Sequence, residues 1–308
     1  MIKLSIEDLI SKAWQKQNDY LFNDAINYYQ DAVTLANNLK DNDKIIECSL
    51  ALGRLYRSLS RYSESINYYE TVLNIAKHDN KNNINNLVKA YIGKGISSRF
   101  LGKYEESIKC YKEGLKLAES IEDKTNMAKC LTNLGSIYNI LSKYSEAKIY
   151  LEQSLPIVLE IRNMDSLSKV YENLGVLNIN LKDYQQAIDY LTKALAISKE
   201  IGNKISESNC YLSLSICLMY TKEYQQAIDY LTKALAISKE IGDKDVQGKC
   251  YGNLGVISII MDKVTEAKMY FTKGLEIARE IGDKELERNC SKNLSYIIEK
   301  QTKHNLKT

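Results

Sequence analysis

Arginine is scarce in this chain, and most of it lies in one short stretch. The sequence holds seven arginines and 35 lysines. Four of the arginines fall close together, at Arg54, Arg57, Arg61 and Arg99. A guanidinium group is planar and can bind a carboxylate or a phosphate through two parallel hydrogen bonds, which a lysine ammonium cannot do. The cluster therefore predicts a site that captures an acidic group, and the alternative is surface charge without a binding role.

Asparagine and lysine recur at equivalent places, with the lysine one helical turn before the asparagine. The asparagines are Asn133, Asn173, Asn253 and Asn293, and the lysines are Lys89, Lys129, Lys169 and Lys249. An amide side chain can donate and accept a hydrogen bond at once. A ladder of such amides can pair with the backbone of an extended peptide without reading its sequence. The alternatives are a solvated lysine at the start of a helix and an asparagine chosen for local packing.

Apolar side chains form a third set with the same spacing. Val176, Ile216 and Val256 occupy one position, and Ile140, Tyr220 and Ile260 lie one helical turn further along their segments. Exposed together, they would exceed the apolar area that a monomer usually shows to water. They either bind an apolar part of a partner or pack against the next repeat.

Residues suited to catalysis are not brought together by the sequence. The two histidines, His78 and His304, fall in an expected loop and tail, and the HExxH zinc motif is absent. The glycines at 95 and 102, before Lys103, have the wrong spacing for a phosphate-binding loop. We therefore expect a protein that is not an enzyme and that needs no metal or other cofactor.

The elements that must position these side chains repeat about every forty residues. A small residue marks the repeats, at Gly53, Gly95, Gly135, Gly175, Ser215, Gly255 and Ser295, and the steps are 40 residues except for one of 42. A leucine usually stands just before it, and Lys94 is the exception. Apolar residues spaced three or four apart predict two helices per repeat. Units of this length cannot bury their apolar faces alone and must stack on their neighbours.

The residues of each unit resemble the tetratricopeptide repeat. The pattern begins with Asn-Leu-Gly and continues with a tyrosine that closes the turn, then an alanine, then an aromatic residue or leucine, and finally Ala-Leu. One unit has Asn173-Leu174-Gly175, Tyr184, Ala187, Leu191 and Ala194-Leu195. The forty-residue step and the Ile-Gly-Asp-Lys loops are similar to the longer subtype of kinesin light chains and Pins-type G-protein-signalling modulators. Lys94, Ser215 and Val264 depart from the pattern without breaking the register.

This resemblance implies an all-α, right-handed superhelical solenoid of antiparallel helix pairs, with about seven repeats and a C-terminal capping helix. We expect one solenoid over residues 1–300 and a flexible tail over 301–308. The expected repeats are 1–40, 41–80, 81–122, 123–162, 163–202, 203–242 and 243–282, with the cap at 283–300. Trp14 is expected to close the exposed end of the stack or to form a contact surface, and residues 78–83 to form an inserted loop.

In the resembled family the first helix of each pair lines a concave groove, and its inner asparagine pairs with peptide backbone. The register then turns the asparagine, lysine and apolar sets inward, together with Arg54, Arg57 and Arg99. In the repeat 203–242 the asparagine position is taken by Ser213, and Met219 lies near Ile216 and Tyr220. We expect that repeat to hold an apolar side chain of the partner.

The seven cysteines predict packing rather than chemistry. Five of them, Cys48, Cys130, Cys210, Cys250 and Cys290, share one repeat position. Equivalent atoms in stacked helices lie roughly 10 Å apart, whereas a disulfide needs Cα atoms within about 7 Å. We expect free cysteines buried between helices.

Composition and charge limit the partners. The net charge of +3 is too small to demand nucleic acid, and the acidic N-terminus does not resemble a signal peptide. No apolar run is long enough to cross a membrane. We expect a soluble cytoplasmic protein without nucleic-acid or membrane partners.

One internal duplication stands out. Residues 184–202 and 224–242 are identical, but the segments that follow them differ at most positions. Either the groove-lining helices varied while the outer ones stayed fixed, or a duplication ended at these boundaries.

The favoured interpretation is a non-catalytic protein-interaction scaffold that binds an extended or helical peptide segment, with acidic and aliphatic residues, in its groove. Two alternatives stay open. One is a peptide-sensing regulator that changes its superhelical pitch on binding, and the other is a protein that self-assembles through its terminal repeats.

Overall fold

The computed structural model describes residues 4–78 and 83–305, and these residues form helices and short connections without a strand. The helices are α1 (Ile6–Asn18), α2 (Phe22–Leu39), α3 (Asn42–Ser58), α4 (Tyr62–His78), α5 (Ile84–Phe100), α6 (Tyr104–Ser120), α7 (Lys124–Ile140), α8 (Tyr144–Ile161), α9 (Met164–Asn180), α10 (Tyr184–Glu200), α11 (Lys204–Tyr220), α12 (Tyr224–Glu240), α13 (Lys244–Ile260), α14 (Val264–Ile281) and α15 (Lys284–Asn305). Residues 79–82 of the expected inserted loop lie outside the described residues.

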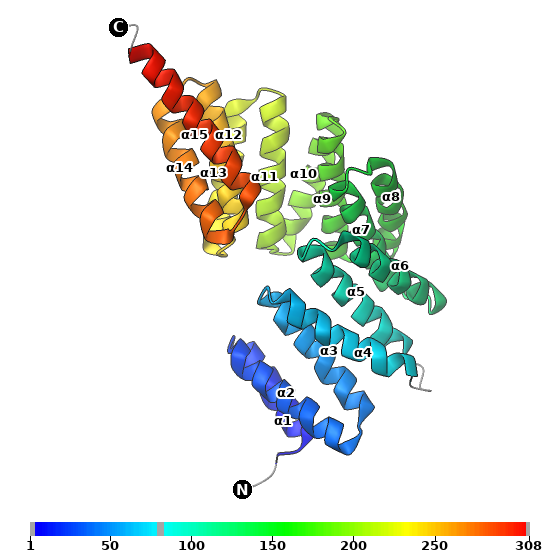
Figure 1. Cartoon of the computed structure of the whole chain (residues 1–308). Coiled ribbons are helices and arrows are strands. Elements are labelled where there is room, and N and C mark those ends of the chain that lie inside the picture. Colours follow the sequence, from blue (N-terminus) through cyan, green and yellow to red (C-terminus); the bar gives the residue numbers. More distant parts are fainter. Residues whose placement is uncertain (1–3, 79–82, 306–308) are drawn as a thin grey trace. The chain divides into compact units, whose positions relative to one another are not determined.

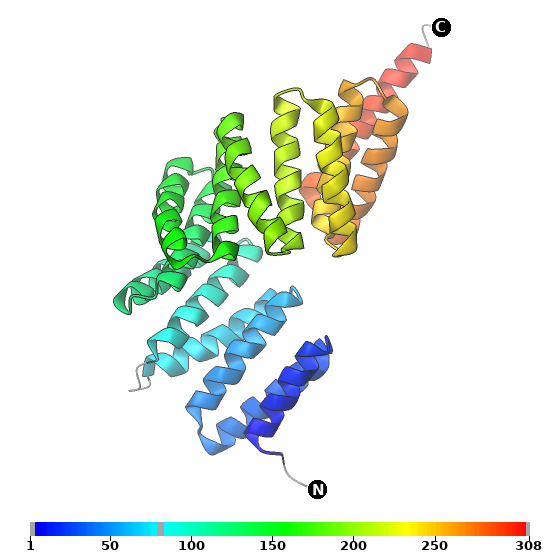
Figure 2. The same ribbon diagram turned by 180° about the vertical axis from the view of Figure 1, so that it is seen from behind.

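The helices group into two compact units, of which the first ends at Ile161 and the second begins at Arg162. Unit 1 contains α1–α8 and unit 2 contains α9–α15, and within each unit every helix packs on the next (Figures 1 and 2). From α3 to α7 and from α9 to α15, each odd-numbered helix also contacts the next odd-numbered helix. The predicted all-α fold of stacked helix pairs with a final single helix is confirmed.

Short polar caps begin most of the odd-numbered helices. The side chain of Asp243 accepts a hydrogen bond from the backbone N–H of Val246 at 3.1 Å, as expected for an N-cap. Asp41, Asp123, Asn163 and Asn203 play the same part for their helices. Gly242, just before Asp243, has φ +74° and ends the preceding helical segment in the left-handed conformation. The forty-residue period therefore has a local stop and start signal.

The recurring small residues let the two helices of a pair approach closely. A Cβ atom on Gly135 would lie 2.5 Å from Cγ of Leu151, and one on Gly95 would lie 2.7 Å from Cε1 of Tyr111. Ser215 fits at the equivalent place because its hydroxyl donates to the backbone carbonyl of Leu212 at 2.6 Å. The small residues are therefore packing positions.

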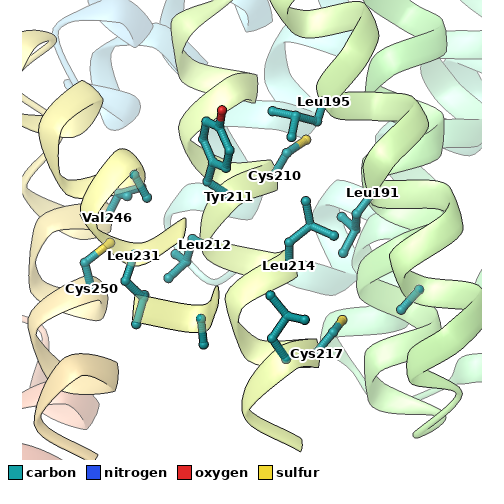
Figure 3. Packing of buried hydrophobic residues seen from close by; sticks show 14 of the residues in the cluster. Leu191, Leu195, Cys210, Tyr211, Leu212, Leu214, Cys217, Leu231, Val246 and Cys250 are labelled. Atoms are coloured by element: carbon teal, nitrogen blue, oxygen red, sulfur yellow. The ribbon is translucent and has the colours of Figure 1, made fainter. Parts of the chain in front are cut away.

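The cysteines are free and buried, as predicted. Figure 3 shows Cys210, Cys217 and Cys250 among leucines of the unit 2 core. Burial raises the pKa of the Cys210 thiol to about 12 and has the same effect on Cys250. At neutral pH these thiols remain protonated, so they behave as small apolar groups.

Lys94 shows how a lysine occupies a leucine position. Its side chain is 15% exposed, and its Nζ lies 2.7 Å from Oε1 of Glu70 on α4 and 2.9 Å from Oε1 of Glu106 on α6. Burial lowers the pKa of Lys94, but hydrogen bonds to Glu70 and Glu106 outweigh it and raise that pKa above its ordinary value. The aliphatic stem packs while the ammonium reaches two carboxylates.

The terminal helices differ in part from expectation. Trp14 on α1 is 62% exposed, so its indole forms accessible surface rather than filling the end of the core. Helix α15 continues to Asn305, beyond the predicted cap end at residue 300; residues 306–308 of the expected flexible tail lie outside the described residues. In the described part of the chain, no helix is both long and apolar enough to cross a membrane.

The two identical segments form α10 and α12, yet their surroundings differ. Leu195 and Ile197 of α10 are buried, whereas the equivalent Leu235 and Ile237 of α12 are half-buried. Tyr184 at the start of α10 stacks on Tyr220 with ring centroids 4.7 Å apart. The position equivalent to Tyr220 in α13 is Ile260. Identical sequence therefore does not give the two copies identical burial or ring contacts.

Candidate binding surface

A basic hollow lies on the odd-numbered helices of unit 1. It has a volume of about 390 Å³ and is lined by four cationic side chains, Arg54, Arg57, Lys89 and Lys129, from α3, α5 and α7. Leu50, Ile92, Gly93 and Tyr69 supply apolar surface beside them. A second hollow of about 360 Å³ shares Leu50, Arg54 and Lys89 with it. Two members of the predicted arginine set and two of the lysine set therefore meet in one place.

The charges of this hollow are largely uncompensated. None of its four cations forms an ion pair with another residue in the described ranges 4–78 and 83–305. Asp123 also lines the hollow, and because its carboxylate accepts hydrogen bonds only from neutral N–H groups of Asn126 it keeps its charge, so four cations face one carboxylate among the described lining residues. An anion in the hollow would therefore meet positive groups that form no ion pair with a described residue.

Tyr69 reaches the hollow from α4, which packs on α3 and α5. Its ring is almost fully buried on α4 and packs between Gly53 and Gly93, and a Cβ on Gly93 would lie 2.2 Å from Cζ of Tyr69. Burial raises the pKa of the Tyr69 hydroxyl, whereas Arg57 and Arg54 act to lower it. The ring thus joins the lining of the basic hollow, and these guanidinium groups lie close enough to influence its hydroxyl.

Arg99 and Asn133, the other predicted site residues of unit 1, do not line this hollow. Arg99 is half-buried, its guanidinium carbon lies 4.6 Å from the centre of the Phe100 ring, and its Nε has no hydrogen-bond partner among the described residues. Asn133 is half-buried on α7. The structure therefore separates Arg99 from Arg54 and Arg57.

A second, more apolar hollow lies on α11, α13 and α15 of unit 2. Its volume is about 410 Å³. Apolar surface comes from Leu212, Ile216, Val256, Phe271 and Leu286, and polar groups come from Lys249, Asn253, Asn289 and Asn293. Members of the asparagine, lysine and apolar sets therefore converge here.

The predicted lysines and asparagines of unit 2 are partly engaged in contacts within the chain. Lys169 Nζ lies 3.0 Å from Oε1 of Glu172, and Lys249 Nζ lies 2.6 Å from Oδ2 of Asp245. Asn173 Nδ2 donates to the backbone carbonyl of Lys169 at 2.9 Å, and Asn293 Nδ2 donates in the same way to Asn289. Each of these amides keeps its side-chain oxygen as an acceptor for a ligand.

The apolar set divides into a sheltered row and an exposed row. Val176, Ile216 and Val256 are half-buried, whereas Ile140, Tyr220 and Ile260 are 48%, 62% and 50% exposed. Val256 also packs against the cluster around Phe271. Core packing therefore applies to the sheltered row, and partner contact by the exposed row stays a prediction.

Family comparison agrees with this arrangement of helices. The family model described as the tetratricopeptide repeat matches residues 21–78, 87–160 and 166–240, and a second model of the same description matches residues 248–281. The chain belongs to the tetratricopeptide repeat family. No curated protein sequence matched the chain.

Solved structures with similar folds support this tetratricopeptide repeat assignment. Apo RapI is 15% identical with a TM-score of 0.76, and the match covers 91% of this chain and 99% of RapI. A Rap protein complexed with Competence and Sporulation Factor is 15% identical with a TM-score of 0.69, covering 98% and 87%. BtubC (BKLC) from P. vanneervenii is 19% identical with a TM-score of 0.57, covering 78% and 94%. At these identities the likeness concerns the fold.

Several lining residues were missed by sequence reasoning. Tyr69 occupies the helix position that is also tyrosine at Tyr29 and Tyr111, whereas later repeats carry Leu151, Leu191, Leu231 and Phe271, so this group of hydroxyls was visible in the sequence. Gly252 is the sole glycine at a position where equivalent helices carry Leu50, Ile92, Thr132, Glu172, Leu212 and Lys292. Both differences become meaningful only when the hollows are seen.

Proposed function

We propose that this tetratricopeptide repeat protein is a non-catalytic, cytoplasmic interaction scaffold, and that unit 1 binds an acidic polypeptide segment across α3, α5 and α7. The observation that carries the proposal is the convergence of Arg54, Arg57, Lys89 and Lys129 on one hollow without ion-pair partners in the described residues. Arginine can bind carboxylates through two hydrogen bonds. The flanking Leu50 and Ile92 would contact the apolar parts of the segment.

The decisive test is binding of acidic and neutral peptides to charge-reversed protein. Arg54→Glu combined with Arg57→Glu should weaken binding of a glutamate-rich peptide at least tenfold, because it replaces attraction by repulsion. Lys112→Glu combined with Lys116→Glu makes the same change in net charge on exposed positions of α6 and serves as the control. Equal affinity of both variants for the peptide would refute the proposal.

A second candidate is a regulator that changes conformation when it binds its ligand. The similarity of fold to the Rap protein complexed with Competence and Sporulation Factor supports this candidate. Scattering profiles recorded with and without a bound acidic peptide distinguish the two: a scaffold keeps its profile, whereas a regulator of this kind changes it.

A third candidate is self-assembly through the terminal helices. Trp14 on α1 and Tyr296 on α15 are 62% and 54% exposed, which supports a contact surface at these positions. Sedimentation at increasing protein concentration tests this candidate. A mass that stays at 35.2 kDa would exclude it.

A further inference from the structure

In the apolar hollow of unit 2, one lining position on α13 lacks a side chain. Gly252 lies in the lining, where the equivalent residue of α11 is Leu212. A Cβ on Gly252 would have only ordinary contact, 3.4 Å from Cδ1 of Leu286. A helix-interior glycine is destabilising by roughly 1 kcal/mol relative to alanine, and packing does not require it at this position. The missing side chain instead leaves space of side-chain size.

The walls and rim of this hollow differ in chemistry. Ile216, Val256 and Leu286 are partly accessible apolar groups, and Leu212 and Phe271 are buried behind them. Asn253 and Asn293 stand at equivalent positions on adjacent odd-numbered helices. Such helices pack roughly 10 Å apart, which is about the length of three residues in an extended chain. A strand-like segment could therefore meet both amides while a side chain between them enters the hollow.

The rim is acidic, in contrast to the hollow of unit 1. Asp283 and Glu285 line it and form no ion pair with a cation in the described part of the chain. Within the described ranges, the Asp283 carboxylate accepts hydrogen bonds only from the backbone N–H groups of Glu285 and Leu286. Lys249, the cation of the lining, is already paired with Asp245 at 2.6 Å. A partner that carries a positive side chain next to its apolar one would therefore balance the charges of Asp283 and Glu285.

We propose that this hollow is a binding subsite for an extended polypeptide segment in which a large aliphatic or aromatic residue is flanked by arginine or lysine. The inference rests on the proposed function only in taking the partner to be a polypeptide. It assigns the apolar side chain to the space left by Gly252, the backbone to Asn253 and Asn293, and the flanking cation to Glu285 and Asp283.

The test uses the full chain and a set of peptides with blocked ends. The parent peptide is Ser-Gly-Arg-Leu-Arg-Gly-Ser; one relative has alanine in place of leucine, and another has glutamate in place of both arginines. Binding is measured by isothermal titration calorimetry. We expect the parent peptide to bind. The peptide with alanine should bind about tenfold more weakly or worse because it buries less apolar surface, and the peptide with glutamate should bind several-fold more weakly.

Variants locate the bound peptide. Gly252→Leu should abolish binding of the parent peptide by filling the hollow, and Gly252→Ala should weaken it to an intermediate degree. Circular dichroism and thermal unfolding confirm that each variant folds; because glycine is replaced by better helix formers, we expect no loss of helicity. Glu285→Lys should weaken binding of the parent peptide, which carries arginine, and strengthen binding of the peptide that carries glutamate.

The outcomes separate this inference from the proposal for unit 1. Combined Arg54→Glu and Arg57→Glu should leave binding of the parent peptide unchanged. If that variant abolished binding, or if folded Gly252→Leu bound as well as the parent protein, the inference would be overturned. Absence of saturable binding by the parent peptide would overturn it too, and the acidic-peptide result for unit 1 would be unaffected.

Discussion

The ring of Tyr69 on α4 lies against the backbone of Gly93 on α5, where a Cβ would come within 2.2 Å of the ring. This contact links the packing of unit 1 to its basic hollow, because Tyr69 and Gly93 both belong to the lining. At the corresponding pair in unit 2, Leu231 of α12 is followed by Asn253 of α13. Asparagine also stands at this position after the aromatic residues Tyr111 and Phe271, as Asn133 and Asn293, so at this pair of positions the close approach of ring and glycine is particular to Tyr69 and Gly93.

Gly93→Ala should destabilise the protein by about 1–3 kcal/mol, because the new methyl group overlaps the Tyr69 ring. Tyr69→Leu should recover much of this loss when it is combined with Gly93→Ala. Urea unfolding of both single variants and the double variant gives the coupling free energy. Purely additive effects would show that the ring and the glycine do not constrain each other.

The ion-paired Lys94 allows a prediction about buried charge. Lys94→Leu should retain stability to within about 1 kcal/mol, because leucine fills this position elsewhere and burial of the ion pair opposes its attraction. Lys94→Ala should cost about 1–3 kcal/mol by removing both the stem and the pairing to Glu70 and Glu106. Chemical denaturation at neutral pH measures both; a leucine variant less stable than the alanine variant would contradict the prediction.

The pH dependence of the Lys94 contribution has a definite sign. Because pairing raises the pKa of Lys94 above its ordinary 10.5 in the folded protein, its contribution is fully present below that pH and is lost as pH rises through the folded value. The stability difference between the parent and Lys94→Gln should therefore be constant from neutral pH to about pH 10 and shrink above it. If the stability difference between the parent and Lys94→Gln shrank only when the pH was lowered, the raised pKa of Lys94 could not be its cause.

The buried thiols predict loss of stability in alkali. The pKa of Cys210 is raised by burial from 9.0 to about 12, so above pH 9 the unfolded chain loses a proton that the folded chain keeps. Stability should fall between these two values. Cys210→Ala should reduce the slope of unfolding free energy against pH by about one proton in that interval. Unfolding in reducing buffer at several pH values gives the slopes, and an unchanged slope would contradict burial of the thiol.

Asn253 provides a prediction about recognition of peptide backbone. Asn253→Ala should weaken binding of the parent arginine–leucine peptide by about 0.5–1.5 kcal/mol, which is the net contribution of one hydrogen bond. The loss should be similar for the peptide with phenylalanine in place of leucine, since an amide that pairs with backbone does not distinguish side chains. Isothermal titration with both peptides measures this. A loss confined to one peptide would indicate a side-chain contact.

The register of the repeats was predictable from the sequence, because Gly135 and its equivalents recur, usually with leucine beside them, and close helix crossings leave no room for a Cβ at the glycines among them. The state of the charged groups was not predictable. Lys169 and Lys249 are paired with Glu172 and Asp245, whereas Lys89 and Lys129 are not paired with described residues, although all four share one repeat position. Pairing depends on rotamers and on neighbours that a period cannot specify. For the same reason, register alone grouped Arg99 with Arg54 and Arg57.

The identity of α10 and α12 has a consequence for how unit 2 acquires its structure. A chain in which α12 docks on α9 in place of α10 would offer that helix the same side chains and would expel one repeat as a long loop. The contacts between α9 and the docked helix are the same in both arrangements and cannot distinguish them. The stacking of Tyr184 on Tyr220 distinguishes them only once α11 has packed on α10. Refolding should therefore include a slow correction of misaligned molecules, and substitutions that make the two copies different should remove it.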